Sequence, residues 1–125
     1  MAIPDYSGYG CIYLVTNLIN GKRYVGQTIQ RLRTRWAAHC NPSNNKCRAL
    51  SAAITLYGRD NFLVEIIAVA NDKDELDKLE FAMVKEHNCI APDGYNLKHG
   101  GGSRGPLTDE LKARIRLSTI ASHGN

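Results

Sequence analysis

The stretch CIYLVTNLINGKRYVGQ, residues 11–27, decides the fold of this 125-residue chain. It contains two short runs rich in β-branched and aromatic residues, 11–16 and 23–27. Between them lies the pair Asn20-Gly21, a strong tight-turn signal. The pattern therefore predicts a β-hairpin.

Two registers are open for this hairpin. If Asn20-Gly21 alone forms the loop, Tyr13 lies opposite Thr28. If residues 17–20 form a four-residue loop, Tyr13 lies directly opposite Tyr24. Both loops have an even length, and side chains alternate along a strand, so Tyr13 and Tyr24 share a face in either register.

The apolar residues after the hairpin follow a helical spacing. A helix over residues 29–40 is predicted by four residues on one stripe, namely Ile29, Leu32, Trp36 and Cys40. A loop follows, and then a second helix over residues 47–57, which Gly58 ends.

The dense apolar run 62–69 predicts a third strand in a central position, with both faces covered. A third helix begins after Asp72, whose spacing to Glu75 is that of a capping box, and runs to about His87. The glycine-rich stretch 94–105 predicts a flexible connection that ends the core.

The segment after that connection predicts a last short helix. Thr108 can cap it, and its basic residues then form either a surface helix or a basic arm. Three apolar residues face one way, Leu111, Ile115 and Leu117, and three basic residues supply charge, Lys112, Arg114 and Arg116.

The composition is that of an ordinary globular protein, with 43% hydrophobic and 22% charged residues, and excludes a disordered chain. The apolar runs are far shorter than the roughly 20 residues of a membrane span. The N-terminal residues do not form a secretory leader. We therefore expect a soluble, intracellular, cytoplasmic protein with no membrane partner.

The cysteines have no Cys-x-x-Cys spacing and are too few for a disulfide scaffold, so reduced structural thiols are expected at Cys11, Cys40, Cys47 and Cys89. The alternative is a zinc site drawn from His39, Cys40, Cys47, His87 and Cys89. These spacings match no closed four-ligand pattern.

Charge is segregated along the chain, although the net charge is only +4. Residues 6–58 contain no acidic residue, whereas residues 60–93 contain nine acidic residues and three lysines. A cationic front half attracts phosphate backbones, which makes nucleic acid the expected partner. The candidate contacts are Lys22, Arg23, Arg31, Arg33, Lys46 and Arg48. The alternative is a solvated basic face.

Glu80 lies among apolar residues on the predicted third helix. At about 100° per residue it falls inside the arc formed by Leu76, Leu79, Met83 and Val84. A buried unpaired charge costs several kcal/mol, so Glu80 needs a partner. The functional interpretation is a ligand for Mg²⁺. The structural alternatives are a salt bridge to an arginine and a stem that bends out to solvent.

The other groups that phosphodiester hydrolysis needs are supplied by Tyr13, Tyr24, Arg35 and His39. Arg35 can hold negative charge that develops on phosphoryl oxygens, and His39 can accept or relay a proton. A tyrosine is a poor base at neutral pH, but nearby Lys22, Arg23 and a metal would favour its anion. Each residue also has an ordinary packing role as the alternative.

These residues belong to short motifs with a defined order and spacing. Cys11-Ile12-Tyr13 and Tyr24-Val25-Gly26 are separated by ten residues and are followed by Arg35-Trp36, His39, Glu80 and Gly94-Tyr95-Asn96. The set, over about residues 10–101, resembles the GIY-YIG nuclease family. Cys11 replaces the glycine of the family pattern. Because cysteine is small, we expect the chemistry to survive.

The resemblance implies a small α/β (α+β) domain with a three-stranded antiparallel sheet flanked by helices, which cuts DNA with one Mg²⁺ or Mn²⁺ and leaves 5′-phosphate and 3′-hydroxyl ends. Tyr13 would activate or orient the attacking water with support from Tyr24. Arg35 would stabilise the phosphoryl charge and His39 would assist proton transfer. Glu80 would hold the divalent ion, and Asn96 would orient the scissile backbone.

The resemblance also implies a domain organisation. Residues 1–102 would form the catalytic domain, and residues 103–125 a basic helical tail or the start of a DNA-binding linker, as in phage-type homing endonucleases acting in a phage or bacterial host cytoplasm. Two alternatives stand beside an endonuclease. One is a DNA- or RNA-binding module that does not cut, and the other is a scaffold in which Glu80 pairs with Arg35.

Overall fold

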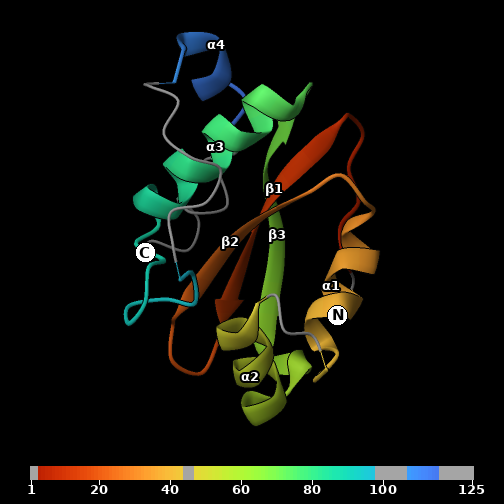
Figure 1. Ribbon diagram of the computed structural model, residues 1–125, viewed down its shortest axis with the longest axis vertical. Coiled ribbons are helices and arrows are strands. Elements are labelled where there is room, and N and C mark those ends of the chain that lie inside the picture. The colour runs from red at the N-terminus through yellow and green to blue at the C-terminus, as the bar shows by residue number, and fades with distance from the viewer. Residues whose placement is uncertain (1–2, 44–46, 98–106, 116–125) are drawn as a thin grey trace.

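The computed structural model describes residues 3–43, 47–97 and 107–115. In chain order the elements are β1 (Gly10–Asn17), β2 (Arg23–Thr28), α1 (Leu32–Cys40), α2 (Arg48–Tyr57), the 3₁₀ turn η1 (Arg59–Asn61), β3 (Phe62–Ala70), α3 (Lys73–Glu86) and α4 (Asp109–Lys112). Figure 1 shows the three strands between α3 on one side and α1 on the other. The α/β architecture predicted from the sequence is confirmed.

The sheet is antiparallel with strand order β2-β1-β3. The central position predicted for residues 62–69 is therefore wrong, because β1 is central and β3 lies at an edge. β3 is nevertheless buried on both faces: Val64 and Ile66 belong to one core cluster, and Ile67 and Ala68 belong to the other. Apolar density along a strand reports the layers above and below it, and it does not report the strands beside it.

The β1–β2 hairpin pairs Tyr13 with Gly26, so neither expected register is correct. The backbone N–H of Asn17 donates to the carbonyl of Lys22, which leaves a four-residue loop at residues 18–21. This loop starts one residue later than the four-residue alternative, and Gly21 adopts a φ of 80° within it. The shared face is confirmed, because Tyr13 and Tyr24 lie in the same core cluster.

The sheet separates two core clusters. The first contains the two tyrosines and lies against α1 and α2, with Leu32, Trp36, Leu50 and Ile54 among its buried residues. The second lies against α3, with Ile12, Val25, Leu76 and Leu79 among its buried residues. The edge strand β2 is therefore covered by α1 and α2 on one face of the sheet and by α3 on the other.

The ends of the helices follow from local hydrogen bonds. α1 starts at Leu32, so the predicted start at residue 29 is wrong. Thr28 Oγ1 accepts from the Gln30 N–H, which keeps the residues between β2 and α1 outside the helix and leaves Ile29 62% exposed. α3 starts as predicted, with the Asp72 carboxylate accepting from the Glu75 N–H at 2.9 Å. Neither helix is long and apolar enough to cross a membrane, and the same is true of the other helices in the described residues.

The described part of the C-terminal segment packs on the rest of the core. Thr108 caps α4 through its bond with the Leu111 N–H, as predicted. Leu111 is buried within the second core cluster, and Arg114 forms an ion pair with Glu75 of α3. The predicted positions of Leu117 and Arg116 lie outside the described residues, as does most of the glycine-rich connection, and the domain division at residue 102 stays a prediction.

Candidate active site

Gly26 lets strand β2 pass directly over the Tyr13 hydroxyl. A Cβ atom at Gly26 would lie 2.5 Å from Tyr13 Oη and 2.8 Å from Tyr24 Cε2. Such distances are below van der Waals contact, so only glycine fits between the two rings. The glycine of the second motif therefore has a packing reason: it allows the Tyr13 hydroxyl to reach the edge strand.

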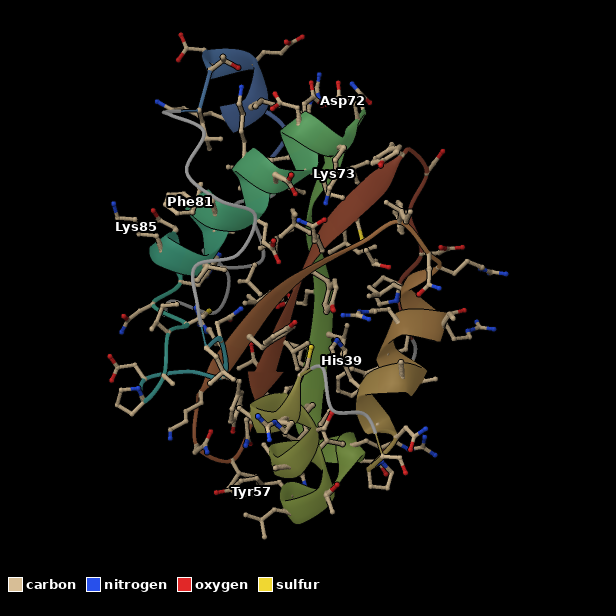
Figure 2. The ribbon with its side chains drawn as sticks, viewed as in Figure 1. His39, Tyr57, Asp72, Lys73, Phe81 and Lys85 are labelled. Atoms are coloured by element: carbon tan, nitrogen blue, oxygen red, sulfur yellow. The ribbon has the colours of Figure 1, made fainter. Side chains whose placement is uncertain are left out.

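Tyr13 connects Arg35 and His39 in a chain of hydrogen bonds. Arg35 Nε donates to Tyr13 Oη at 3.3 Å. Tyr13 Oη lies 2.6 Å from His39 Nε2. Since its oxygen already accepts from the guanidinium, the phenol can donate its proton to a neutral imidazole. Figure 2 shows His39 at the inner side of α1, facing the sheet. We call the hydrogen-bonded residues Arg35, Tyr13 and His39 the relay.

The relay is neutral at Tyr13 and His39 in the free protein. Burial raises the pKa of Tyr13, and the charge and hydrogen bond of Arg35 only partly oppose this. Burial, with a smaller contribution from the Arg35 charge, lowers the pKa of His39 to about 3. At pH 7 the imidazole is therefore an uncharged acceptor. Its buried Nδ1 atom has no hydrogen-bond partner among the described residues.

Tyr24 lies beside the relay and contacts a cysteine that the sequence did not single out for the site. Its ring centroid is 6.1 Å from that of Tyr13 and 5.4 Å from the His39 ring. Its hydroxyl lies 3.3 Å from Cys47 Sγ, which also accepts from Arg35 Nη2 at 3.9 Å. Burial raises the pKa of Tyr24. No sequence motif predicts that Cys47 lies beside Tyr24 and Arg35, because this contact depends on tertiary structure.

The positive charge at the tyrosines comes from Arg35. Lys22 and Arg23, which the sequence suggested would favour a tyrosine anion, do not supply it. Arg23 alternates to the other face of β2, where its Nη1 lies 3.3 Å from Nδ1 of His87. Lys22 is exposed in the hairpin loop. The expected effect of Lys22 and Arg23 is therefore wrong, since burial raises the pKa of both tyrosines, and the effect of a metal on their pKa stays a prediction.

Glu80 reaches the edge strand from α3, on the opposite face of the sheet from the relay. Its Oε1 accepts from Gln27 Nε2 at 2.8 Å. The same Nε2 donates to Asp77 Oδ1 at 3.0 Å. Gln27 directly follows Gly26, so adjacent residues of β2 contact the carboxylates on one face and the Tyr13 hydroxyl on the other. The edge strand thus joins the two halves of the candidate site.

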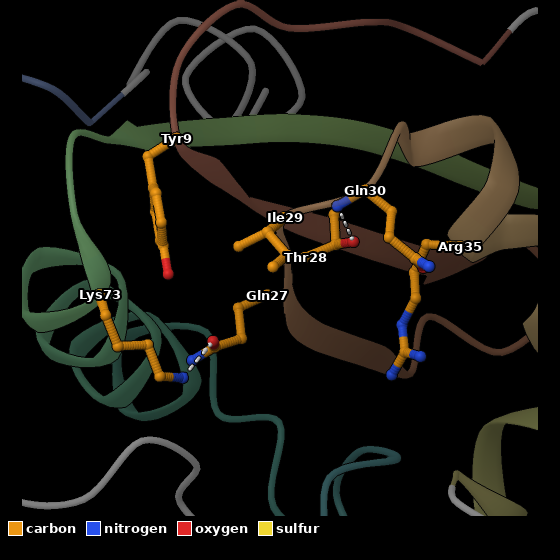
Figure 3. Close-up of a pocket in the computed structure, with 7 residues that line it drawn as sticks. All are labelled: Tyr9, Gln27, Thr28, Ile29, Gln30, Arg35 and Lys73. Atoms are coloured by element: carbon orange, nitrogen blue, oxygen red, sulfur yellow. Dashed lines mark hydrogen bonds between the residues drawn. The ribbon is translucent and has the colours of Figure 1, made fainter.

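A groove of about 400 Å³ lies along this edge, lined by Tyr9, Gln27, Thr28, Ile29, Gln30, Arg35 and Lys73. Figure 3 shows Lys73 and Arg35 on opposite sides of Ile29. The groove therefore has one cationic side chain from α3 and one from α1. An anionic, elongated ligand such as a nucleic acid backbone matches this spacing of charge.

Asn96 does not present its amide to the groove. The side chain is buried and accepts from the Val25 N–H at 2.9 Å through Oδ1. It donates through Nδ2 to the Val25 carbonyl at 2.8 Å. In the described structure the Asn96 amide therefore holds β2, the strand that carries Tyr24 and Gly26, and its contact with a scissile backbone stays a prediction.

The predicted nucleic-acid contacts come from separate parts of the fold. Lys22 lies in the hairpin loop, Arg31 and Arg33 lie at the start of α1, and Arg48 is the first residue of α2. These four side chains are exposed, and Arg31 pairs with Asp5 at 3.3 Å. Lys46 lies outside the described residues. The structure does not test whether any of these residues binds nucleic acid.

The donor atoms at Glu80 fit a hard divalent cation better than zinc. Glu80 and Asp77 offer carboxylate oxygens one helical turn apart, and Mg²⁺ binds one or two carboxylates together with water and phosphate oxygens. Within the described ranges, no group of three or more His, Cys, Asp or Glu residues could hold a metal. A cation at Glu80 would therefore need oxygen atoms from water and a phosphate.

The ligands of the alternative zinc site lie on both sides of the sheet. Cys40 and Cys47 pack against the first core cluster, and Cys89 belongs to the second. Tetrahedral coordination requires its ligands within about 2.3 Å of one ion. The layer of strands between these cysteines is incompatible with one shared site.

The order of motifs and the fold agree with a known nuclease class. The GIY-YIG catalytic domain family matches residues 9–96. This range contains the hairpin, the relay, the α3 carboxylates and Asn96. The chain belongs to this family and is a GIY-YIG nuclease catalytic domain.

Three phage relatives and one solved domain are similar to this chain. Among proteins of Enterobacteria phage T4 named as endonucleases, segD is 32% identical over 72% of this chain, segB 33% over 71% and segE 27% over 94%. The chain spans 38% of segD, 38% of segB and 54% of segE.

The solved structure of the catalytic domain of homing endonuclease I-TevI matches with a TM-score of 0.60 and 25% identity, over 71% of this chain and 98% of that domain. A glutamate-to-alanine mutant of the same domain matches with a TM-score of 0.63 and 24% identity, over 77% of this chain and 98% of that domain. The three-stranded antiparallel sheet with flanking helices is therefore the family fold.

Proposed function

We propose that this chain is a DNA endonuclease that hydrolyses a phosphodiester bond with one divalent cation, Mg²⁺ or Mn²⁺, bound at Glu80. The products would be 5′-phosphate and 3′-hydroxyl ends. The observation that carries the proposal is the edge of β2, where Gly26 admits the Tyr13 hydroxyl and Gln27 contacts Glu80. The named endonuclease relatives support DNA as the substrate.

In this proposal the relay handles the proton of the attacking water. Tyr13 is fully buried in the free protein, so the water would have to reach Oη beside Gly26 once substrate is bound. There it would give a proton to Oη while the phenol passes its own proton to His39 Nε2, which lies 2.6 Å away. The water oxygen would then bond to phosphorus as the bond to the 3′ oxygen breaks. The 3′ oxygen would take a proton from a water molecule in the groove, and His39 would return its proton to Tyr13, which would release its own proton to solvent. Arg35, which lines the groove, would stabilise the charge that develops on the phosphoryl oxygens.

Proton transfer along the relay is unfavourable without a further group. A phenol with a raised pKa is a weak acid, and an imidazole with a pKa of about 3 is a weak acceptor, so proton transfer between them is uphill in the free protein. When bound, the cation would polarise a phosphoryl oxygen and lower the charge that must build up in the transition state. We therefore expect cleavage to depend strictly on the cation.

We propose that sequence recognition lies outside residues 1–102. The chain spans about half or less of the length of the phage relatives it matches. We propose a homing-type endonuclease in which residues 1–102 cut and the segment from residue 103 leads to a DNA-binding part. Within this segment, Leu111 packs in the second core cluster and Arg114 pairs with Glu75 of α3.

A nicking assay on supercoiled plasmid tests the proposal. The wild-type chain should nick DNA in Mg²⁺ and not in EDTA, and Glu80→Ala and Arg35→Ala should both lose the activity. DNA binding without cutting by the wild type would support the binding module. Neither binding nor cutting would support the scaffold, in which Glu80 pairs with Arg35; here Arg35 contacts Tyr13 and Glu80 contacts Gln27.

A further inference from the structure

Gln27 has every polar atom of its amide engaged on the α3 side of the groove. Nε2 carries two hydrogens, and it donates to Glu80 Oε1 at 2.8 Å and to Asp77 Oδ1 at 3.0 Å. Oε1 accepts from Lys73 Nζ at 3.0 Å. Rotating the amide by 180° would turn its carbonyl oxygen towards two carboxylates. The contacts therefore fix a single orientation of this side chain.

Lys73 fixes the other end of the same network. Its ammonium also pairs with Asp77 Oδ1 at 3.0 Å, one helical turn along α3. Asp77 is 5% exposed, whereas the Lys73 side chain is 63% exposed and lines the groove. One ammonium at the surface thereby orients the glutamine, and the glutamine orients two carboxylates below it. None of these hydrogen bonds of Gln27 involves the relay.

From these contacts we propose that Gln27, oriented by Lys73, is a positioning residue that holds the Glu80 carboxylate in the orientation that binds the divalent cation. The inference rests on the proposed function, because it assumes that Glu80 is the metal ligand. Groups that hydrogen-bond to a metal-binding carboxylate fix its direction and reduce the reorganisation needed on binding. Gln27 would act through Glu80 and would not touch the substrate.

Three substitutions by methionine test this role with similar side-chain volumes. Gln27→Met removes both donors to the carboxylates, and Lys73→Met removes the group that orients Gln27. Lys78→Met is the matched control, because Lys78 makes the same kind of i,i+4 ion pair on α3, with Asp74 at 3.1 Å, and does not line the groove. Melting temperatures check that each variant folds.

Two measurements separate positioning from a general structural role. The first is the Mg²⁺ concentration that gives half-maximal plasmid nicking. Gln27→Met should raise it about 10- to 100-fold with a near-normal maximal rate, Lys73→Met should raise it less, and Lys78→Met should leave it unchanged. The second is Mn²⁺ affinity by electron paramagnetic resonance, with and without a DNA duplex, where the same order is expected.

The outcomes distinguish this inference from the proposed function. If the wild type binds Mn²⁺ but does not nick, the proposed function fails, while weaker Mn²⁺ binding by Gln27→Met still supports positioning. The inference is overturned if Gln27→Met lowers the maximal rate without changing either metal measurement, or changes nothing. It is also overturned if the wild type takes up no Mn²⁺. Should Gln27→Met not fold, Lys73→Met at the exposed end decides between these results.

Discussion

The two faces of the sheet hold their candidate catalytic groups in different ways. On the α1 face, Tyr13 and His39 are completely buried and uncharged, and core packing fixes their positions. On the α3 face, Glu80 is half-buried, and a network of polar side chains connects it to the groove. In the proposed function, the groups for proton transfer would therefore be held by core packing, whereas the carboxylate for cation binding would be held by polar contacts near the surface.

This difference makes the two halves separable by experiment. Defects on the α3 face should respond to cation concentration, because the lost function is metal binding. Defects on the α1 face should not, because the lost function is proton transfer.

Glu80→Ala should abolish cleavage and leave DNA affinity largely intact. Loss of the cation removes several kcal/mol of transition-state stabilisation, which corresponds to about a 10³-fold slower rate or more. Single-turnover nicking and a gel shift on the same DNA measure the two effects. A parallel collapse of affinity would show that Glu80 is needed for binding and would contradict its role as a metal ligand.

Tyr13→Phe should slow cleavage by about 10²- to 10⁴-fold, the range for loss of a general acid–base group. The phenylalanine keeps the ring in the core but removes the oxygen shared by Arg35 and His39. Raising Mg²⁺ or replacing it by Mn²⁺ should not restore the rate, in contrast to Gln27→Met. Rescue of Tyr13→Phe by excess cation would break the distinction between the two faces.

Gly26→Ala should damage the relay and the fold together. The added Cβ would meet Tyr13 Oη at 2.5 Å, so the ring or the strand has to move. Overpacking of this kind costs about 1–3 kcal/mol, and a displaced hydroxyl should slow nicking by about 10²-fold. Urea unfolding and nicking rates test both. An alanine variant with wild-type stability and rate would show that the close approach has no role.

Asn96→Ala should act mainly on stability. It leaves the N–H and the carbonyl of Val25 without their side-chain partners, at a cost of about 1–3 kcal/mol. Its effect on the cleavage rate, measured at a temperature where the variant is folded, should be smaller than that of Tyr13→Phe. A large rate loss with unchanged urea stability would instead support the contact with the scissile backbone.

The burial of His39 predicts a pH dependence of stability. The pKa of His39 is about 3 in the folded chain and near 6.5 when unfolded, so the unfolded state binds one more proton between these values. The stability that this difference in the pKa of His39 gives to the folded state is fully present above about pH 6.5. As the pH falls towards 3, the free energy of unfolding decreases by on the order of 1 kcal/mol per pH unit. His39→Gln should show a shallower decline than the wild type in urea unfolding from pH 6.5 to 4.5. Equal slopes would mean that His39 is not buried neutral.

The sequence predicted the elements of this fold well, because they depend on local patterns. The capped start of α3 at Asp72, the shared face of Tyr13 and Tyr24 and the start of α4 follow from spacing alone. The register of the hairpin did not follow, since the hydrogen bonds of Asn17 set the loop. The edge position of β3 also did not follow, because strand order depends on contacts distant in sequence.

The candidate site shows the same limit. Motif order located the tyrosines, Arg35, His39 and Glu80, but it gave no reason for Gly26 and did not include Gln27 or Cys47. Gln27 did have a signal, since it directly follows the Tyr24-Val25-Gly26 motif at the edge of the sheet. The contact of Asn96 with the backbone of Val25 could not be inferred, because the two residues are 71 positions apart in the sequence.

The central claim is that the relay and Glu80 are two halves of one active site. The most direct test is the single-turnover nicking rate of the double variant Tyr13→Phe with Glu80→Ala, compared with each single variant. Groups that act as a unit have strongly non-additive effects, so the double variant should be no slower than Glu80→Ala alone. A double variant slowed by the product of the two single effects would show that the two halves act independently and would contradict the account.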